Sequence, residues 1–470
     1  MGRRTNVILF LILAACQISQ ASVVYISSSE GSDSNDGLTK EQPLRTIQYA
    51  LSKADTIYLK SGDYFYENIT VSRGMISKYG EKQLPVLCGF KRIVEPKWQR
   101  VAENIWCISL SDDNYTGFDT KGTSQLNNIG CVYEWDKKLL HGRKYQYKSQ
   151  LKEDWDIWQT EHFKKEEVSD HDFDSLYLYL HDNPNNLKLA FSVGAIAIRI
   201  SNSTLDHIRI EGFGFGISAG SNTTIRYCEV DAIGGMISIP SKYYVCYGNG
   251  IEFWTSREIS NCLVENSVVS RCYDSGCTIQ GHDAGAKNIR FRNNIIIDCC
   301  QGWEDYLRNE DPKIAYTNCF FENNFVVNSG STSGFGYPKD RKQYCHVLGY
   351  NSMGEKGMII RNNTFVGGNF YCASEFHNRY CSNHWVGNKC YINRGDWLLR
   401  CIENGTTFIA IPEEKGVFSS LKKATENTIS QYRELTGDNT TKFIITSDKK
   451  RNRIIARLKQ KFANQTNFSF

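Results

Sequence analysis

The stretches Val264-Glu-Asn-Ser-Val-Val269, Phe291-Arg-Asn-Asn-Ile-Ile296 and Phe321-Glu-Asn-Asn-Phe-Val326 repeat one short pattern within the 470-residue chain. The same pattern returns at residues 225–230, 360–365 and 386–391, and in degenerate form at 208–213. Each copy combines β-branched or aromatic runs with Gly, Asn and Ser, which is the chemistry of strands and turns. Repeats 20 to 50 residues apart are typical of solenoids. The sequence therefore predicts stacked coils that bury their apolar faces on one another.

A column of asparagines runs through the aligned repeats. It contains Asn266, Asn293, Asn323, Asn362 and Asn388, at intervals of 27, 30, 39 and 26 residues. Identical amide side chains on successive rungs hydrogen-bond to one another at a spacing of roughly 4.8 Å. We therefore expect these five side chains to form a ladder.

The N-terminal region adds an independent signal. It reads Val23-Val-Tyr-Ile-Ser27, a Gly- and Asx-rich turn, Pro43, Thr46-Ile-Gln-Tyr-Ala50, and then a strand and turn over 54–64. With the repeats, this resembles the right-handed parallel β-helix proteins of the pectate-lyase-like superfamily over roughly residues 23–410. The resemblance implies an all-β solenoid in which a helix over 46–53 covers the strand edge at the N-terminal end.

The resemblance does not extend to one enzyme subfamily. The signatures of polygalacturonases and of calcium-dependent pectate lyases are missing. The segment Asn249-Gly-Ile-Glu-Phe-Trp254 partly resembles chondroitinase-B and alginate lyases, but Gln280-Gly281 stands where those enzymes carry a catalytic lysine. This partial match implies that Glu252 is a calcium or substrate ligand.

Five segments are expected along the chain. They are a signal peptide (1–21), an N-terminal cap with the first coils (22–110), an aromatic-rich inserted subdomain (111–190), regular coils (191–410) and a short helical, basic tail (411–470). The insertion serves either as an aromatic wall for sugar rings or as a subdomain with its own core. The tail either docks on an acidic polymer or a membrane surface, or covers the end of the stack. A net charge of +4, or +2 without Arg3 and Arg4, is too balanced for nucleic-acid binding.

The first 21 residues predict export. Arg3 and Arg4 precede an apolar run that is too short to span a bilayer. Cleavage after Ser19-Gln-Ala21 would release the chain, whereas Leu13-Ala-Ala-Cys16 resembles a lipobox that would tether it to a membrane through lipidated Cys16. The protein is therefore expected outside the cell or at its surface, which in a bacterium includes the periplasm and outer membrane.

Seventeen cysteines are too few for a disulfide scaffold. We expect a stacked column of small buried thiols at the repeat positions Cys228, Cys262, Cys277, Cys299, Cys300 and Cys319. Bridges in the last coils, among Cys372, Cys381, Cys390 and Cys401, are the alternative.

A second strand in each coil carries the candidate site. Its copies, aligned by a leading glycine, begin at Gly250, Gly276, Gly302 and Gly334. Alternation along a strand then points Ile251, Cys277, Trp303 and Phe335 inward. It points two columns outward: Glu252, Thr278, Glu304 and Gly336, and beside them Trp254, Gln280, Tyr306 and Pro338. Carboxylates beside aromatic rings suit the cleavage of sugars, with Trp254 and Tyr306 stacking on pyranose faces.

Glu252 and Glu304 lie two rungs apart, so their backbones are expected roughly 9.5 Å from each other. Inverting glycosidases hold their carboxylates roughly 6.5–9.5 Å apart. Further candidates cluster nearby, with Asp274, Asp305 and Arg308 as catalytic groups and His282 and Arg341 as substrate ligands. Asp305 is expected to point inward, where a carboxylate needs a partner or a raised pKa. Taken singly, each acidic residue equally suits a solvating role on a solenoid surface.

Three functions follow, in order of preference. The first is an extracellular glycoside hydrolase that uses Glu252 and Glu304 as paired carboxylates. The second is a polysaccharide lyase acting on a uronate polymer, with a calcium requirement and with Arg308, Lys339 or Arg341 as base. The third is a non-catalytic glycan-binding or adhesive solenoid. In each case the partner is a polysaccharide or oligosaccharide, and we expect a monomer.

Overall fold

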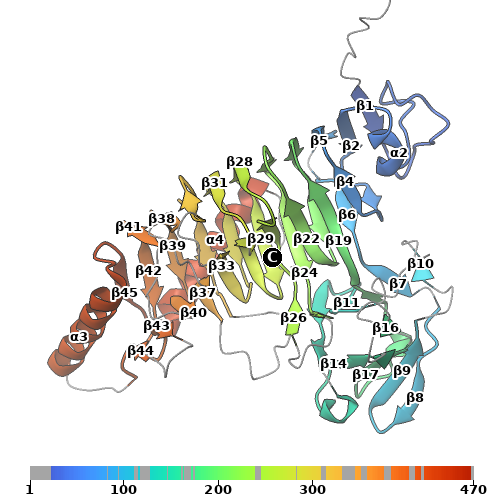
Figure 1. Ribbon diagram of the computed structural model, residues 1–470. Coiled ribbons are helices and arrows are strands. Elements are labelled where there is room, and N and C mark those ends of the chain that lie inside the picture. Colours follow the sequence, from blue (N-terminus) through green and yellow to red (C-terminus); the bar gives the residue numbers. More distant parts are fainter. Residues whose placement is uncertain are drawn as a thin grey trace, which may run out of the picture.

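Three long parallel sheets form the body of the protein (Figure 1). The computed structural model describes residues 23–81, 83–93, 95–110, 115–116, 128–145, 147–159, 162–163, 171–172, 175–238, 245–281, 283–307, 314–330, 344–350, 357–374, 383–401, 408–413 and 418–466. Successive coils of the chain add one strand to each sheet in turn, and each strand pairs with its counterpart in the coils before and after. This is the strand order of a parallel β-helix.

The three sheets are named here in the order in which the chain visits them. Sheet 1 contains β1 (Val23–Ile26), β2 (Thr56–Lys60), β5 (Gly74–Tyr79), β20 (Ser203–Asp206), β23 (Thr224–Arg226), β28 (Ile259–Glu265), β31 (Ala286–Arg292), β34 (Tyr316–Thr317), β35 (Phe320–Glu322), β38 (Ile359–Arg361) and β41 (His384–Val386). Sheet 2 contains β3 (Tyr64–Phe65), β6 (Val86–Cys88), β21 (Arg209–Glu211), β24 (Glu229–Ile233), β29 (Val268–Cys272), β32 (Ile295–Ile297), β36 (Phe325–Val327), β39 (Thr364–Val366), β42 (Lys389–Ile392) and β45 (Lys442–Ile445). Sheet 3 contains β4 (Ile69–Val71), β19 (Val193–Ile200), β22 (Phe213–Ala219), β27 (Ile251–Trp254), β30 (Ser275–Gly281), β33 (Gln301–Leu307), β37 (Cys345–Tyr350), β40 (Tyr371–Ser374), β43 (Trp397–Cys401) and the antiparallel β44 (Phe408–Ala410).

The interior of the coils is a set of apolar columns. In sheet 1 the first residues of five predicted repeats lie in register and are fully buried: Ile225, Val264, Phe291, Phe321 and Ile360. Two copies were misaligned. The residue equivalent to Ile225 in the preceding coil is Leu205 rather than Ile208, and in the last coil it is Trp385 rather than Val386. Both copies are degenerate, so spacing alone did not fix their register.

The predicted asparagine ladder exists one residue away from the predicted column. Asn266, Asn293, Asn323 and Asn362 have left-handed backbones with φ between 51° and 56°, and they make the turn. The ladder is built by the next residue, at Asn294, Asn324, Asn363 and Asn388, whose amides join at 3.1–3.2 Å and also cap backbone groups. Only Asn388 was placed in the correct column. The left-handed turn position favours asparagine as strongly as the ladder position does. The residue type alone therefore could not show which of the two neighbouring asparagines forms the ladder.

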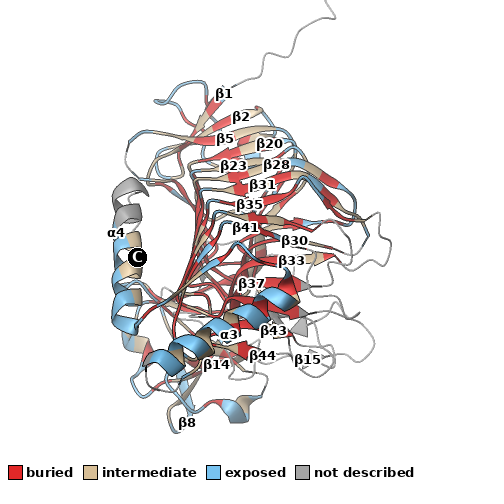
Figure 2. Cartoon of the chain, turned by 90° about the vertical axis from the view of Figure 1, so that its left-hand side faces the viewer, coloured by how far each residue is buried: buried red, intermediate tan, exposed pale blue. Residues whose placement is uncertain are grey.

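Both ends of the stack are covered. At the N-terminal end α2 (Ile47–Leu51), capped by Thr46, lies within the predicted helix over 46–53 and buries Ile47 and Ala50 (Figure 1). At the other end α3 (Phe418–Thr436) packs on β43 and β44, with Tyr432 fully buried. Helix α4 (Asp448–Thr466) runs along the stack (Figure 2), where Ile455 and Leu458 pack against apolar side chains of sheet 2. No helix among the described residues has the length and apolar character needed to cross a lipid bilayer.

The inserted segment interrupts the second coil between β6 and β19. Its two small sheets consist of β7 (Lys91–Ile93), β10 (Tyr115–Thr116), β11 (Val132–Glu134), β12 (Leu139–His141) and β18 (Leu189–Phe191), and of β8 (Gln99–Ala102), β9 (Ile105–Ser109), β13 (Arg143–Lys144), β14 (Asp156–Gln159) and β17 (Ser175–Tyr179). A short hairpin, β15 (His162–Phe163) with β16 (His171–Asp172), completes it, and a second hairpin, β25 (Met236–Ser238) with β26 (Val245–Tyr247), leaves the stack between sheets 2 and 3 two coils later. Strands β7 to β9 belong to the insertion, which therefore begins before residue 111.

The insertion has an apolar core of its own, which includes Trp98, Ile157, Leu178 and Phe191. Trp98 and Phe191 are buried in this core, and Trp106 and Trp155 pack against it. Tyr133 and Trp135 are different, because they pack beside sheet 2 and not in that core.

The cysteines of the described residues are free thiols, and most are buried, but they do not form one column. Cys262 and Cys319 lie at sheet 1, Cys277 lies on β30 of sheet 3, and Cys228 occupies the ladder position of its coil, where its backbone N–H donates to the Ser267 hydroxyl. Cys372, Cys390 and Cys401 are unbridged, and Cys381 lies outside the described residues.

Replacing Asn324 tests the ladder. Its side chain accepts from the Asn294 backbone N–H at 2.9 Å and donates to the Phe291 carbonyl at 2.9 Å, all in a buried position. Asn324→Ala leaves these groups unpaired, at roughly 1–3 kcal/mol for each buried group. We expect urea unfolding followed by circular dichroism to give a loss of about 3 kcal/mol in unfolding free energy.

The matched control is Asn318→Gly. Asn318 belongs to an exposed ladder in which its amide donates to Asn288 at 2.7 Å, and glycine tolerates its φ of 52°. We expect a loss of about 1 kcal/mol or less. Equal losses for the two variants would show that the buried ladder does not stabilise the stack.

Candidate functional site

The two predicted columns lie on sheet 3 in the predicted register. Glu252 pairs with Thr278 and Thr278 with Glu304, while Trp254 pairs with Gln280 and Gln280 with Tyr306. The inward partners Ile251, Cys277 and Trp303 are fully buried. Side chains far apart in sequence are therefore brought onto one face by the stacking of β27, β30 and β33.

The fourth rung of the prediction is wrong. The strand that pairs with β33 is β37, so Leu348 follows Glu304 and Tyr350 follows Tyr306 in place of Gly336 and Pro338. The segment 334–338 lies outside the described residues. The Phe-Gly-Tyr run has the composition of a strand, which is why the sequence pointed to it. The segment that actually pairs with β33 is Cys345–Tyr350.

The carboxylate column is also less exposed than predicted. Thr278 is 0% exposed, Glu304 is 7% exposed and Glu252 is half-buried. Trp254, in the neighbouring column, is 42% exposed. Gln280 and Tyr306 are half-buried. The carboxylates thus lie in a partly desolvated environment beside an exposed indole.

Amide donors hold Glu252. Its Oε2 accepts from Asn249 Nδ2 at 2.7 Å and from Gln280 Nε2 at 3.1 Å. Burial raises the pKa of Glu252, these two hydrogen bonds oppose the rise, and the negative charge of Asp274 adds to it. The carboxyl group therefore keeps its proton to a higher pH than a free glutamate does.

Glu304 is connected to the same set of residues. The Ser275 hydroxyl donates to Glu304 Oε2 at 2.5 Å, and the Ser275 backbone N–H donates to Asn249 Oδ1 at 3.1 Å. Asn249 thus links the surroundings of both glutamates. The Gln301 amide, with its nitrogen as donor, lies 3.1 Å from Asp274 Oδ1. Glu252, Asp274 and Glu304 therefore belong to one polar cluster where the strands of sheet 3 begin.

Thr278 lies between the two glutamates without a hydrogen bond. Its Oγ1 is buried and has no partner in the described part of the chain. Buried hydroxyl groups are nearly always paired, because an unpaired one costs free energy. This hydroxyl is thus available to a group that enters the column.

Asp305 does not share this face. It is 0% exposed, in line with the inward alternation, and it accepts a hydrogen bond from Asn383 Nδ2 at 2.9 Å inside the coil. Asn383 supplies the partner that a buried carboxylate requires.

Three predicted residues, Arg308, His282 and Arg341, and the proposed lipidation residue Cys16 lie outside the described residues. Among the residues that are described, no group of three or more His, Cys, Asp or Glu side chains is arranged to hold a metal ion.

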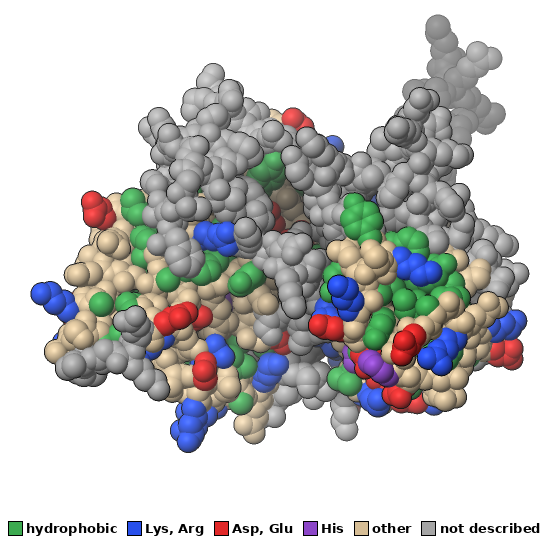
Figure 3. Space-filling model, turned by 90° about the horizontal axis from the view of Figure 1, so that it is seen from below, with side chains coloured by type: hydrophobic (Ala, Val, Ile, Leu, Met, Phe, Trp, Pro, Cys, Tyr) green, Lys and Arg blue, Asp and Glu red, His purple; other side chains and the backbone are tan. Residues whose placement is uncertain are grey.

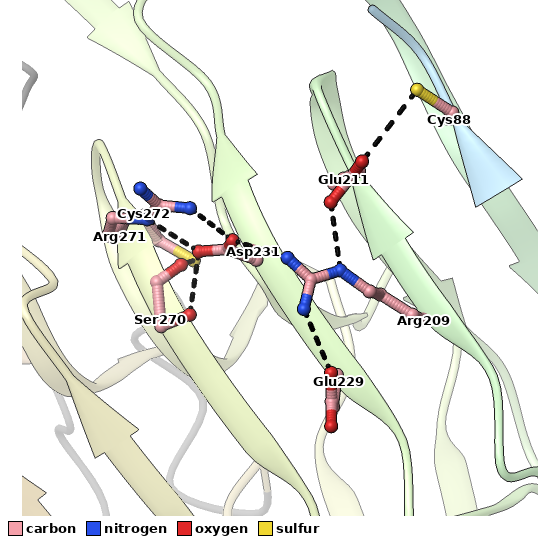
Figure 4. A network of polar contacts seen from close by, with 8 residues as sticks. All are labelled: Cys88, Arg209, Glu211, Glu229, Asp231, Ser270, Arg271 and Cys272. Atoms are coloured by element: carbon pink, nitrogen blue, oxygen red, sulfur yellow. Dashed lines mark hydrogen bonds and ion pairs between the residues drawn. The ribbon is translucent and has the colours of Figure 1, made fainter. Parts of the chain in front are cut away.

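A second charged cluster, on the outer face of sheet 2, was missed (Figure 4). Arg209 Nε lies 2.8 Å from Glu211, its Nη1 lies 3.0 Å from Glu229, and its Nη2 lies 3.1 Å from Asp231. Arg271 holds Asp231 from the other side through Nε at 2.8 Å, and the Ser270 hydroxyl donates to Asp231 at 2.7 Å. We call these residues the Arg209 network. The alternating charges in Arg209-Ile-Glu211 and Glu229-Val-Asp231 are the signal that was available in the sequence.

Two carboxyl groups of the Arg209 network have pKa values that are shifted in opposite directions. Burial raises the pKa of Glu229 to about 7, although Arg209 opposes the rise. Burial would also raise the pKa of Asp231, but the two guanidinium groups outweigh it and lower that pKa to about 2. Opposite shifts in neighbouring carboxyl groups are common in sites that handle protons, although structural ion pairs produce them as well.

Replacing Thr278 by valine tests the unpaired hydroxyl. Because burial of an unpaired hydroxyl costs roughly 1–3 kcal/mol, we expect Thr278→Val to raise the unfolding free energy by about 1 kcal/mol in urea titrations. The control is Thr223→Val, since buried Thr223 donates to the Gly220 carbonyl at 2.8 Å. That control should lose about 1 kcal/mol. A comparable loss in Thr278→Val would refute the assignment.

The raised pKa of Glu229 predicts a pH-dependent stability. Its pKa is about 7 in the folded protein against 4.5 for the ordinary side chain, so the stabilisation is fully present below pH 4.5 and is lost as pH rises through 7. The wild type minus Glu229→Gln difference in unfolding free energy should change by on the order of 3 kcal/mol across this window. A difference that stays flat between pH 4.5 and 7 would contradict the shift.

Comparisons with known proteins give only distant likenesses. No known protein family and no curated protein matches the chain. Among solved structures, XylC in complex with xylose is 12% identical, with 90% of this chain and 82% of that chain covered and a TM-score of 0.40. The GH136 lacto-N-biosidase from Eubacterium ramulus is also 12% identical, with 81% of this chain and 58% of that chain covered and a TM-score of 0.45. PfbA, a surface adhesin of Streptococcus pneumoniae, is 9% identical, with coverages of 77% and 89% and a TM-score of 0.20.

Proposed function

We propose that the protein is an exported glycoside hydrolase and that its reaction takes place at the Glu252–Glu304 column of sheet 3. The observation that carries the proposal is the pairing of two carboxyl groups, two rungs apart, on either side of an unpaired buried hydroxyl. The exposed Trp254 beside them supplies a flat apolar surface for a pyranose ring.

The two glutamates take different roles in this proposal. Glu252, whose pKa burial raises and whose Oε2 is held by two amide donors, is the general acid that protonates the leaving glycosidic oxygen. Glu304, buried and bonded to Ser275, is the base that activates water. Asp274 acts through Glu252, because its negative charge adds to the rise that burial gives to the pKa of Glu252. The spacing of roughly 9.5 Å between strands two rungs apart suits inversion at the sugar carbon.

Two further parts of the proposal concern the chain as a whole. We take the coils to be right-handed, as parallel crossover connections nearly always are. We also propose that residues 1–21 direct export, with release after Ala21 or tethering at Cys16 as the two outcomes that the mass of the mature protein would separate.

Glutamine substitutions test the roles. Glu252→Gln and Glu304→Gln keep the shape and the hydrogen bonds but remove the proton transfer, so each should lower kcat/KM by about 100- to 10,000-fold. The assay measures released reducing ends and chain lengths on a panel of plant, algal and host polysaccharides. Glu258→Gln, which changes an exposed carboxylate just after β27, should retain full activity.

The same assay separates the alternatives. An unsaturated product that absorbs in the ultraviolet would replace hydrolysis by β-elimination. Glycan retention without any product would leave a binding protein. Turnover that is unchanged in both glutamine variants would remove this column as the reaction site.

A further inference from the structure

The Arg209 network lies where the insertion joins the coils. The chain leaves the second coil after β6 and returns at β19, so strand β11 and the residues after it are brought beside the outer face of sheet 2. Four aromatic side chains border the network on this side. Tyr64 and Tyr66 come from the first coil, and Tyr133 and Trp135 come from the insertion.

These rings form a continuous apolar surface. The centroid of Trp135 lies 6.4 Å from that of Tyr64 and 5.6 Å from that of Tyr133, and Tyr64 stacks on Tyr66 at 6.5 Å. Tyr64 is 40% exposed, so its ring is open to solvent. Seen from below, apolar side chains of the insertion lie beside charged ones (Figure 3).

The aromatic surface and the network lie on the same sheet, because Tyr64 pairs with Val86 and Val86 with Arg209, which puts Tyr64 and Arg209 two rungs apart in one column of sheet 2. Burial raises the pKa of Tyr64 and Tyr133, and for both phenols the next contribution is the negative charge of Glu211, with Arg209 acting in the opposite direction. A ligand resting on Tyr64 would therefore meet the Arg209 end of the network.

The charges at this junction nearly cancel. Three carboxylates, Glu211, Glu229 and Asp231, face two guanidinium groups, Arg209 and Arg271. Arg92, which lies over the Trp135 ring at 3.5 Å, adds a third cation at the edge. When Glu229 is ionised, above its pKa of about 7, the three carboxylates balance the three guanidinium groups, and the junction then suits an uncharged ligand.

The network is held in place at a cost in backbone strain. Six aligned positions of sheet 2, each directly after the register column that contains Glu211 and Asp231, have left-handed backbones, and Gly212, Asp298, Asn328 and Gly367 are residues suited to this conformation. Ala232 and Arg271 are not, with φ of 54° and 46°. Strain of this kind persists where the surrounding structure requires it. At Arg271 it turns the guanidinium group back onto Asp231.

Part of the network remains able to bond a ligand. The Arg209 and Arg271 side chains are 21% and 24% exposed. Glu229 accepts from Arg209 through its Oε2, and a carboxylate has a second oxygen that can also accept. A sugar hydroxyl can both donate to this oxygen and accept from a guanidinium group.

We propose that the junction is a binding site for an uncharged saccharide, in which Tyr64 and Trp135 receive the apolar face of a pyranose ring and the Arg209–Glu229 pair hydrogen-bonds its hydroxyl groups. Binding sites of this type combine an aromatic lining with a few fixed polar groups. The site lies on sheet 2, whereas the Glu252 column lies on sheet 3. The proposal therefore stands whether or not that column is catalytic.

Titration calorimetry on the full chain tests the site. To prevent turnover, the parent is the Glu252→Gln variant, and the probes are cellohexaose, xylohexaose, mannohexaose and chitohexaose, with hexagalacturonate as the anionic comparison. We expect at least one neutral probe to bind. Tyr64→Ala and Trp135→Ala should each weaken its Kd at least tenfold, and Tyr64→Trp, which keeps a ring, should restore most of the affinity.

Tyr147→Ala, which removes a more exposed ring of the insertion, is the control and should bind like the parent. Thermal unfolding of each variant checks that the fold is retained. The proposal is overturned if no neutral probe binds, if only hexagalacturonate binds, or if Tyr64→Ala and Trp135→Ala bind like the parent. Loss of binding in Trp254→Ala alone would assign the affinity to sheet 3 and would also overturn it.

Discussion

Parallel stacking in a fixed register is the constraint from which the rest of the structure follows. Every coil must place one buried side chain under the next, and the Asn294–Asn324–Asn363–Asn388 ladder holds four coils at this spacing inside the turn. A slip by one residue would turn the core face of a strand toward solvent. It would also leave the buried amides without partners. Both penalties act together, so the register that aligns Phe291 with Phe321 also aligns Thr278 with Glu304.

The insertion changes what one corner of the solenoid can do. A regular coil offers only its own outward residues, and these are mostly solvated. Because the second coil opens between β6 and β19, a subdomain with its own core packs beside sheet 2. Burial raises the pKa of both Glu229 and Asp231, but at Asp231 two guanidinium groups outweigh it, so the two pKa values move in opposite directions.

The polar clusters on sheet 3 and on sheet 2 differ in the groups that hold their carboxylates. On sheet 3, Glu252 and Glu304 are held by neutral donors, namely Asn249, Gln280 and Ser275. On sheet 2, each carboxylate is matched by a guanidinium group. A carboxyl group that is held by neutral donors can still bind and release a proton, and it does so near the pKa that its burial gives it. On sheet 2, two guanidinium groups hold the charge of Asp231, whereas Glu229, with a pKa of about 7, titrates near neutral pH. We propose the reaction on sheet 3 because the exposed Trp254 lies beside its carboxyl groups, and we propose the additional binding on sheet 2.

The sequence alone determined the repeat, the inward columns, the cap and tail helices, and the alignment of Glu252 with Glu304, because the apolar period of a strand follows directly from residue order. Only the tertiary structure decided which asparagines form the ladder, since turn and ladder positions favour the same side chain. It also decided that β37 follows β33, that the carboxylate column is largely buried, and that Arg209 meets Glu229 and Asp231. Burial and long-range pairing depend on what packs over a strand, and that partner comes from a distant part of the chain.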